Sequence, residues 1–107
     1  MYQVIKRDGK IAEFSISKIA NAITKAFDAQ NKQYNTDIID FLALKVTADY
    51  QENIENGLIS VEKIQDSVER VLVQAGYADV AKAYILYRKQ REKVRNMNST
   101  LLDYKEL

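Results

Sequence analysis

The fold is decided by residues 4–19, which read VIKRDGKIAEFSISKI. Apolar, mostly β-branched residues stand on both sides of the pair Asp8-Gly9. Such a pair is a strong hairpin signal, because glycine readily adopts the positive φ that a tight turn needs. The pattern therefore predicts strands at about residues 3–7 and 10–14. A helix follows, and Ser17 is its expected N-cap.

The rest of the chain carries the apolar spacing of four helices in all, joined by short polar loops. Short loops favour antiparallel neighbours in a bundle. Asn56-Gly57 is expected to close the second helix as a left-handed cap. Leu58-Ile59 is expected to add a third strand, because a lone hairpin is marginal in water, and Ser60 to cap the third helix. The sequence thus predicts an α+β fold, a four-helix bundle covered at one end by a small three-stranded β-sheet.

The composition excludes several kinds of site. The chain has 107 residues, enough for one domain with a modest core. It contains no cysteine and no histidine, which excludes disulfides, thiolate zinc sites and Ser-His-Asp or Cys-His catalysis by this chain alone. No spacing of carboxylates singles out a metal site. No long apolar run or signal peptide is visible, so a cytoplasmic location without a membrane partner is expected.

Charge is unevenly distributed, although the formal net charge is only +1. Residues 1–27 and 82–95 are rich in lysine and arginine, whereas residues 28–69 are rich in aspartate and glutamate. If the two basic segments meet in space, they form one positive pocket. The alternative is that these charges simply solvate helix faces.

Four features could bind a phosphate group. Lys6 and Arg7 are expected on the hairpin, where a strand holds cationic donors rigidly, although a solvated hairpin tip explains them equally well. Residues 15–18 begin a helix and offer free backbone N–H groups. Ser60 begins another helix. Considered alone, it is better explained as an ordinary N-cap than as a phosphate-binding residue. The basic pair at residues 88–89 lies on the last helix.

Taken in this order, these features resemble the ATP-cone domain, the nucleotide-sensing module at the N-terminus of many ribonucleotide reductases. The resemblance covers about residues 3–92 and implies four helices under a three-stranded sheet, in agreement with the pattern above. It implies binding of ATP, which keeps the reductase active, or of dATP, which inhibits it, with Mg²⁺ on the phosphates. It further implies a regulatory fragment that is not itself an enzyme, a catalytic domain as partner and a nucleotide-dependent homo-oligomer.

The resemblance also implies roles for single residues. Lys6, Arg7 and Lys89 would contact phosphates, residues 12–18 would surround the adenine and ribose, and Gln65 would help to sense the sugar hydroxyls. Ser15 stands where an Asp or Asn is common in the family. This difference affects one hydrogen bond to the adenine or ribose, but not the presence of the site. The expected nucleotide-binding residues are Val4, Lys6, Arg7, Ala12, Glu13, Phe14, Ser15, Ile16, Ser17, Lys18, Ser60, Gln65, Arg88 and Lys89.

Residues 1–95 are expected to form the cone, and residues 96–107 a linker toward a catalytic domain. The linker resembles that of an anaerobic, glycyl-radical (class III) ribonucleoside-triphosphate reductase. The same cone occurs in a reductase-operon transcriptional repressor, but there a cysteine zinc ribbon precedes it, whereas here the cone begins at Met1. Two functions of a different class also fit the residues: a nucleic-acid-binding domain that uses the basic last helix, and a dimerisation module without a ligand. Nucleic acid is the less favoured partner.

Overall fold

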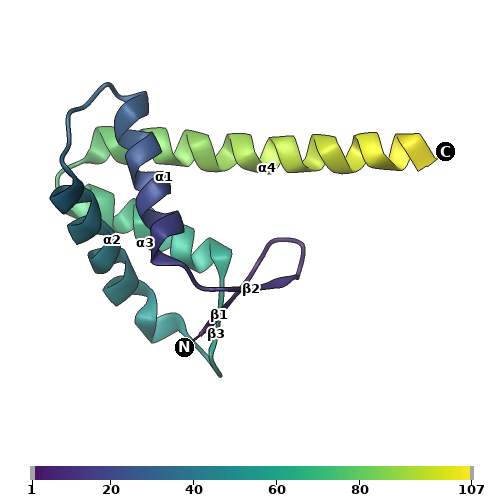
Figure 1. Cartoon of the computed structure of the whole chain (residues 1–107), viewed down its shortest axis with the longest axis horizontal. Helices are drawn as coiled ribbons and strands as arrows, with labels where there is room; N and C mark the ends of the chain where they lie inside the picture. The colour runs from purple at the N-terminus through teal and green to yellow at the C-terminus, as the bar shows by residue number, and fades with distance from the viewer. Residues whose placement is uncertain (1, 107) are drawn as a thin grey trace.

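The computed structural model describes the backbone of residues 2–106 and the side chains of residues 2–92. This part of the chain forms three strands, four α-helices and one short 3-10 helix, η1 (Gln51–Asn53). The predicted α+β fold is confirmed (Figure 1). The strands and α-helices are β1 (Gln3–Ile5), β2 (Ile11–Glu13), α1 (Ile16–Ala29), α2 (Thr36–Tyr50), β3 (Leu58–Ser60), α3 (Val61–Gln74) and α4 (Ala78–Glu106).

The sheet has the strand order β2-β1-β3. The central strand β1 is antiparallel to β2 and parallel to β3, and Val4 lies opposite both Ala12 and Ile59. At the hairpin tip, the N–H of Gly9 donates to the carbonyl of Lys6 at 2.9 Å, and Gly9 has a φ of 85°. The predicted hairpin and third strand are therefore confirmed. The strands are shorter than predicted, so neither of the two cations lies in a strand: Lys6 follows the end of β1, and Arg7 lies in the turn.

Asn56-Gly57 does not cap α2, which corrects the prediction. Both residues have positive φ, 55° and 73°, and they form a two-residue turn. Glu55 and Leu58 flank this turn and exchange two backbone hydrogen bonds of 2.9 Å. An Asn-Gly pair suits a helix cap and a tight hairpin equally, because both need left-handed backbone. Here the turn leads the chain directly into β3.

The helix ends match the predictions in part. Ser60 caps α3, with its Oγ accepting from the N–H of Lys63 at 3.3 Å, as expected. Ser17 does not cap α1, because that helix already begins at Ile16 and Ser15 occupies the cap position. The expected linker is helical over residues 96–106, since α4 runs to Glu106. No proline or glycine follows Gly76 to interrupt it, and Asn, Ser and Thr lower helix propensity only slightly.

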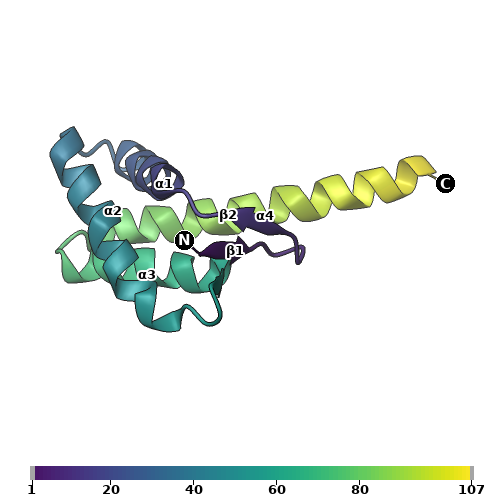
Figure 2. The ribbon, with the colours of Figure 1, turned by 60° about the horizontal axis from the view of Figure 1, so that its bottom comes forward.

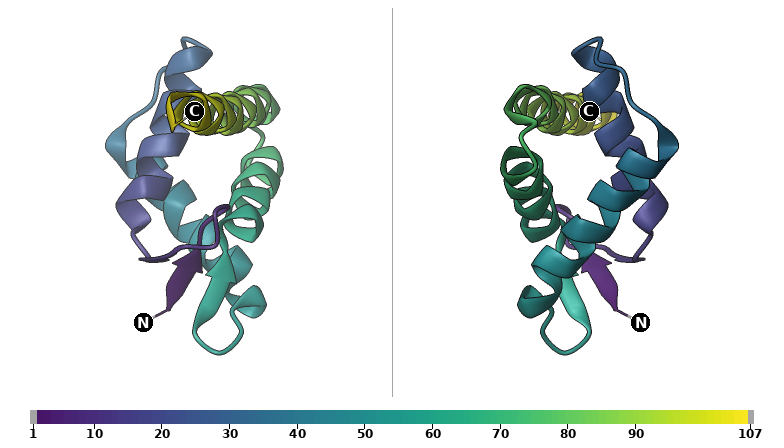
Figure 3. Two further views of the ribbon diagram at one scale, coloured as in Figure 1. Left: turned by 90° about the vertical axis from the view of Figure 1, so that its right-hand side faces the viewer. Right: turned by 90° about the vertical axis from the view of Figure 1, so that its left-hand side faces the viewer.

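The four helices are arranged in a ring. α1 packs on α2 and α4, and α3 packs on the same two helices. Viewed along α4, α1 and α3 lie on opposite sides and the sheet closes the side away from α4 (Figure 3). The C-terminal part of α4 projects beyond the bundle (Figure 1). The core contains the fully buried side chains of Ile23, Phe27, Leu42, Val46, Leu72 and Val80.

An aromatic cluster fastens the hairpin to the bundle. The ring of Tyr50 on α2 is fully buried and lies 5.8 Å from that of Tyr2 and 6.1 Å from that of Phe14, measured between centroids. The hydroxyls of Tyr2 and Tyr50 form a hydrogen bond. Burial raises the pKa of Tyr50, so its hydroxyl stays neutral. None of the helices in the described part of the chain is both long and apolar enough to cross a membrane.

Candidate functional site

A pocket of about 440 Å³ opens between the hairpin, α1, α3 and α4, and we call it the main pocket. Its walls come from four separate parts of the sequence, within residues 4–7, 12–25, 61–68 and 84–92. The structure therefore brings the two basic segments of the sequence together. Figure 2 shows the hairpin at the end of the bundle from which α4 projects.

The lining of the main pocket combines apolar and cationic side chains. The cations outnumber the carboxylates by six to two. Such a lining suits a ligand that has both a flat apolar part and an anionic part. The apolar side chains are Val4, Ala12, Phe14, Ile19, Ala22, Val61, Ile64 and Val68. The charged ones are Lys6, Arg7, Lys18, Lys25, Arg88 and Arg91, with Glu13 and Glu92.

The hairpin turn places both Lys6 and Arg7 at the main pocket. The alternation of side chains along a strand would have allowed only one of them to face inward, but this limit does not apply to Arg7 in the turn. The Nη1 atom of Arg7 lies 3.3 Å from carboxylate oxygens of both Glu62 and Glu92. Its Nη2 atom donates to Oε1 of Gln65 at 3.1 Å.

Arg88 reaches the main pocket from α4 and is also paired. Its Nη1 atom lies 2.9 Å from Asp66 and 3.0 Å from Glu69, both on α3. Burial opposes the charged form of Arg88, but the hydrogen bonds that Arg88 donates to Asp66 and Glu69 outweigh this effect and raise its pKa. Tyr84, one turn earlier on α4, is a core residue, and burial raises the pKa of its hydroxyl.

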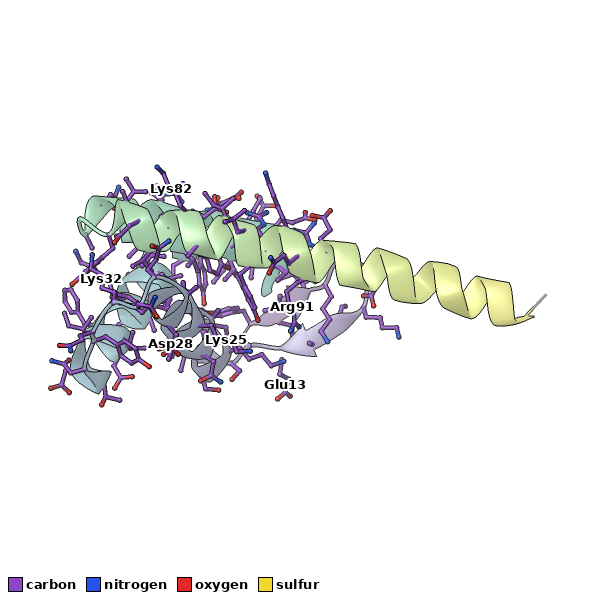
Figure 4. All side chains as sticks on the ribbon, turned by 90° about the horizontal axis from the view of Figure 1, so that it is seen from above. Glu13, Lys25, Asp28, Lys32, Lys82 and Arg91 are labelled. Carbon is purple, nitrogen blue, oxygen red and sulfur yellow. The ribbon has the colours of Figure 1, made fainter. Side chains whose placement is uncertain are left out.

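The main pocket also contains residues that were not among the expected nucleotide-binding residues, and these include Asn21, Lys25, Tyr87 and Arg91. The ring of Tyr87 has Lys25 at 5.6 Å and Arg91 at 5.8 Å from its centroid. Figure 4 shows Lys25 and Arg91 on the side where α1 and β2 face α4, whereas Lys82 points away from that side. Helical spacing was the available signal, because Asn21 and Lys25 follow Lys18 at intervals of three and four residues.

All but four of the expected residues line the main pocket. Ile16 and Ser17 lie exposed in the first turn of α1, where the hydroxyl of Ser17 is 2.7 Å from that of Ser15. The Ser60 hydroxyl is engaged as the cap of α3. Lys89 is exposed and lies outside the main pocket.

Lys89 instead lines a second cavity of about 400 Å³ between α3 and α4, which we call the outer pocket. Its other lining residues are Arg7, Glu62, Glu69, Ile85, Arg88 and Glu92. Arg7, Arg88 and Glu92 line both pockets and so form the wall between them. Among the described residues, no cluster of three or more carboxylates is placed to hold a metal ion.

Comparison with known proteins places these features in a wider group. A family model described as "ATP cone domain" matches residues 2–93. A ribonucleoside-diphosphate reductase subunit alpha of Chlamydia pneumoniae is 40% identical over 98 residues, which covers 86% of this chain and 9% of the relative. An anaerobic ribonucleoside-triphosphate reductase of Haemophilus influenzae is 39% identical over 103 residues, 94% of this chain and 14% of the relative.

A third kind of relative has a similar likeness. A vitamin B12-dependent ribonucleoside-diphosphate reductase of Mycobacterium tuberculosis is 35% identical over 99 residues, which covers 92% of this chain and 14% of the relative. The chain thus spans between 9% and 14% of the length of these three relatives.

Proposed function

The chain belongs to the ATP-cone domain family, as predicted, and on that premise we propose that it is a regulatory domain which binds ATP or dATP in the main pocket and does not itself catalyse a reaction. The observation that carries this proposal is the lining of the main pocket, where an apolar surface meets six cations and only two carboxylates. A nucleoside triphosphate has matching chemistry, because a flat purine is joined to a polyanion. The described part of the chain presents both complements within one cavity.

The lining suggests how the nucleotide is oriented. Apolar side chains of β1, of the segment between β2 and α1, and of α1 itself would contact the purine, and Val4, Phe14 and Ile19 are examples. Lys6 and Lys18 would contact phosphates, and none of the ion pairs among the described side chains involves either lysine. The first turn of α1 supports this placement, because no side chain caps it and its dipole favours an anion.

Discrimination between ATP and dATP depends on a single sugar hydroxyl. Gln65 is suited to this role, because Arg7 donates to its Oε1 and thereby leaves its side-chain N–H groups free for a ligand. A site that is hydrogen-bonded to a hydroxyl favours the ligand that carries it, since the polar partner is otherwise left unpaired. Each nucleotide would then favour a different conformation, and through it a different oligomer.

Magnesium would enter with the nucleotide rather than bind to the protein alone. The donors that line the main pocket are mainly cationic, so they fit phosphate oxygens, and the metal would be coordinated by the phosphates. We further propose that the chain regulates a cytoplasmic ribonucleotide reductase. The catalytic domain of that reductase would be its partner, and residues 96–107 would link the two. The identities to the three kinds of reductase are similar, so they do not indicate the class of the enzyme. We infer the anaerobic class from residues 96–107, which resemble the linker of the anaerobic enzymes.

Two observations weigh against a nucleic-acid-binding function. Arg88 is held by two carboxylates of α3, and Arg91 lies over Tyr87 at the main pocket. These arginines therefore do not form an outward-facing basic stripe, which a phosphate backbone would require. Lys93 and Arg95 lie outside the described side chains. These contacts do not bear on the repressor cone or on the ligand-free dimerisation module.

Calorimetric titration with ATP, dATP and a duplex oligonucleotide separates a nucleotide-binding domain from a nucleic-acid-binding domain and from a dimerisation module without a ligand. Heat with both nucleotides, and competition between them, is the expected result. Heat with the duplex alone, with a steep dependence on salt, would favour nucleic acid instead. No heat with either nucleotide at millimolar concentration would overturn the proposed function.

A further inference from the structure

We propose that Arg7 is a latch between the hairpin and the two helices α3 and α4, and that phosphate in the main pocket competes with Glu62 and Glu92 for its guanidinium group. The inference rests on the proposed function, because the competing phosphate belongs to the bound nucleotide. It goes further by naming the contact through which occupancy of the pocket reaches the helices.

The contacts of Arg7 join three elements of the fold. Nη1 lies 3.3 Å from Glu62 in the first turn of α3 and 3.3 Å from Glu92 on α4, and Nη2 donates to Gln65 on α3 at 3.1 Å. Arg7 itself lies in the hairpin turn, more than fifty residues away in the sequence from each partner. One side chain therefore holds the tip of the hairpin against both helices.

Phosphate and the carboxylates need the same N–H groups. A guanidinium group offers five donors in a fixed planar fork, and a phosphate is bound best by two parallel donors of that fork. In Arg7, both terminal nitrogens are already engaged by Glu62, Gln65 and Glu92. Full engagement of a phosphate therefore requires Arg7 to give up part of these contacts.

The exposure of the partners makes this exchange easy to reverse. The side chains of Glu62 and Glu92 are 51% and 47% exposed, whereas that of Arg7 is only 23% exposed. Water can solvate the released carboxylates at low cost, and ion pairs with an exposed partner contribute little free energy. The two states of Arg7 are thus close enough in free energy for a ligand to shift the balance.

Release of Arg7 has a consequence for α4. The ion pair with Glu92 ties the hairpin to this helix. From Glu92 the helix continues to Glu106, beyond the bundle (Figure 1). Loss of this ion pair would allow α4 to move relative to the hairpin. The position of the helix would then depend on whether the main pocket is occupied.

The test is the affinity of the Glu62→Gln variant for inorganic tripolyphosphate, ATP and dATP, measured by calorimetry on the whole chain. Glu62 lines the outer pocket but not the main pocket, so its charge acts on the ligand through Arg7. Loss of one partly exposed ion pair predicts an affinity about two- to five-fold higher. Glu52→Gln, in η1 and outside both pockets, is the matched control and should leave affinity unchanged.

The same substitution in an Arg7→Gln background isolates the latch, since Glu62→Gln should then have no effect. An equal gain in affinity in both backgrounds would mean that the charge of Glu62 repels the ligand directly and does not act through Arg7. A lower affinity of the Glu62→Gln single variant would mean that Glu62 positions Arg7 for the ligand. Either result overturns the latch while leaving nucleotide binding intact. Tripolyphosphate binding with the expected gain, but without binding of nucleotides, would support the latch and overturn the proposed function. No binding of any of the three ligands overturns both.

Discussion

Replacing Lys6 by alanine gives the most discriminating prediction for the main pocket. The side chain of Lys6 is half-buried in the wall of this pocket and takes no part in the ion pairs among the described side chains. Its charge is therefore available to a phosphate without breaking another contact. Arg7 and Arg88, by contrast, must first leave carboxylates on α3 or α4.

The magnitude follows from the partial exposure of Lys6. Hydrogen bonds to charged groups contribute about 1.5–3 kcal/mol, and a half-buried lysine belongs at the lower end of that range. The Kd for ATP and for dATP should therefore rise about tenfold. The stability of the fold should change by less than about 0.5 kcal/mol, because the backbone hydrogen bond from the Lys6 N–H to Lys10, at 2.8 Å, is retained.

Calorimetric titration gives the affinities, and thermal unfolding followed by circular dichroism gives the stability. Lys82→Ala is the matched control, because Lys82 is an exposed lysine on α4 that points away from the main pocket (Figure 4). It should change neither quantity. A change of less than twofold for Lys6→Ala, or an equal loss for Lys82→Ala, would refute the assignment of phosphates to this part of the pocket.

Three further predictions concern other parts of the molecule. Lys89→Ala should also weaken nucleotide binding, as the family resemblance implies. The effect should be smaller than that of Lys6→Ala, because Lys89 lines only the outer pocket. An equally large loss of affinity in the same titration would place phosphates in the outer pocket. Ile59→Ala in β3 should lower the free energy of unfolding in urea by about 2–5 kcal/mol, since Ile59 is 2% exposed. Ile11→Ala, at an exposed position, should have little effect. Similar losses of stability for the two variants would contradict the packing of the sheet. The hydrogen bond from Arg70 holds the pKa of Asp49 below its ordinary value of 3.8, so the stability from this pair is present above about pH 4 and is lost as the pH falls further. Urea unfolding at pH 6 and pH 3 should show a smaller pH effect in Asp49→Asn than in the unmodified chain, and equal effects would exclude the pair as a source of acid lability.

The sequence predicts the sheet better than the connections around it. Asp8-Gly9 between apolar runs specifies the hairpin locally, so the prediction needed no tertiary information. Asn56-Gly57 was misassigned because the same left-handed backbone serves a helix cap and a tight turn. The length of α4 was underestimated because Asn, Ser and Thr weaken a helix without ending it.

The candidate site was only partly predictable, for a different reason. Neighbouring residues on a helix point about 100° apart, so only one of Arg88 and Lys89 can face the main pocket, and the sequence alone does not say which. Lys25 and Arg91 enter the site only because α1 packs on α4. The ion pairs of Arg7 join segments distant in the sequence, and no local pattern indicates them.

The most direct test of the central claim is a map of amide chemical shifts in the ¹⁵N-labelled domain as ATP is added. We predict that the large shift changes fall on the residues around the main pocket, especially Lys6, residues 12–18 and Gln65. ATP and dATP should perturb the same residues, with the difference between them greatest near Gln65. Shift changes confined to the exposed side of α4 around Lys82, or no change at millimolar ATP, would contradict the claim that the main pocket binds the nucleotide.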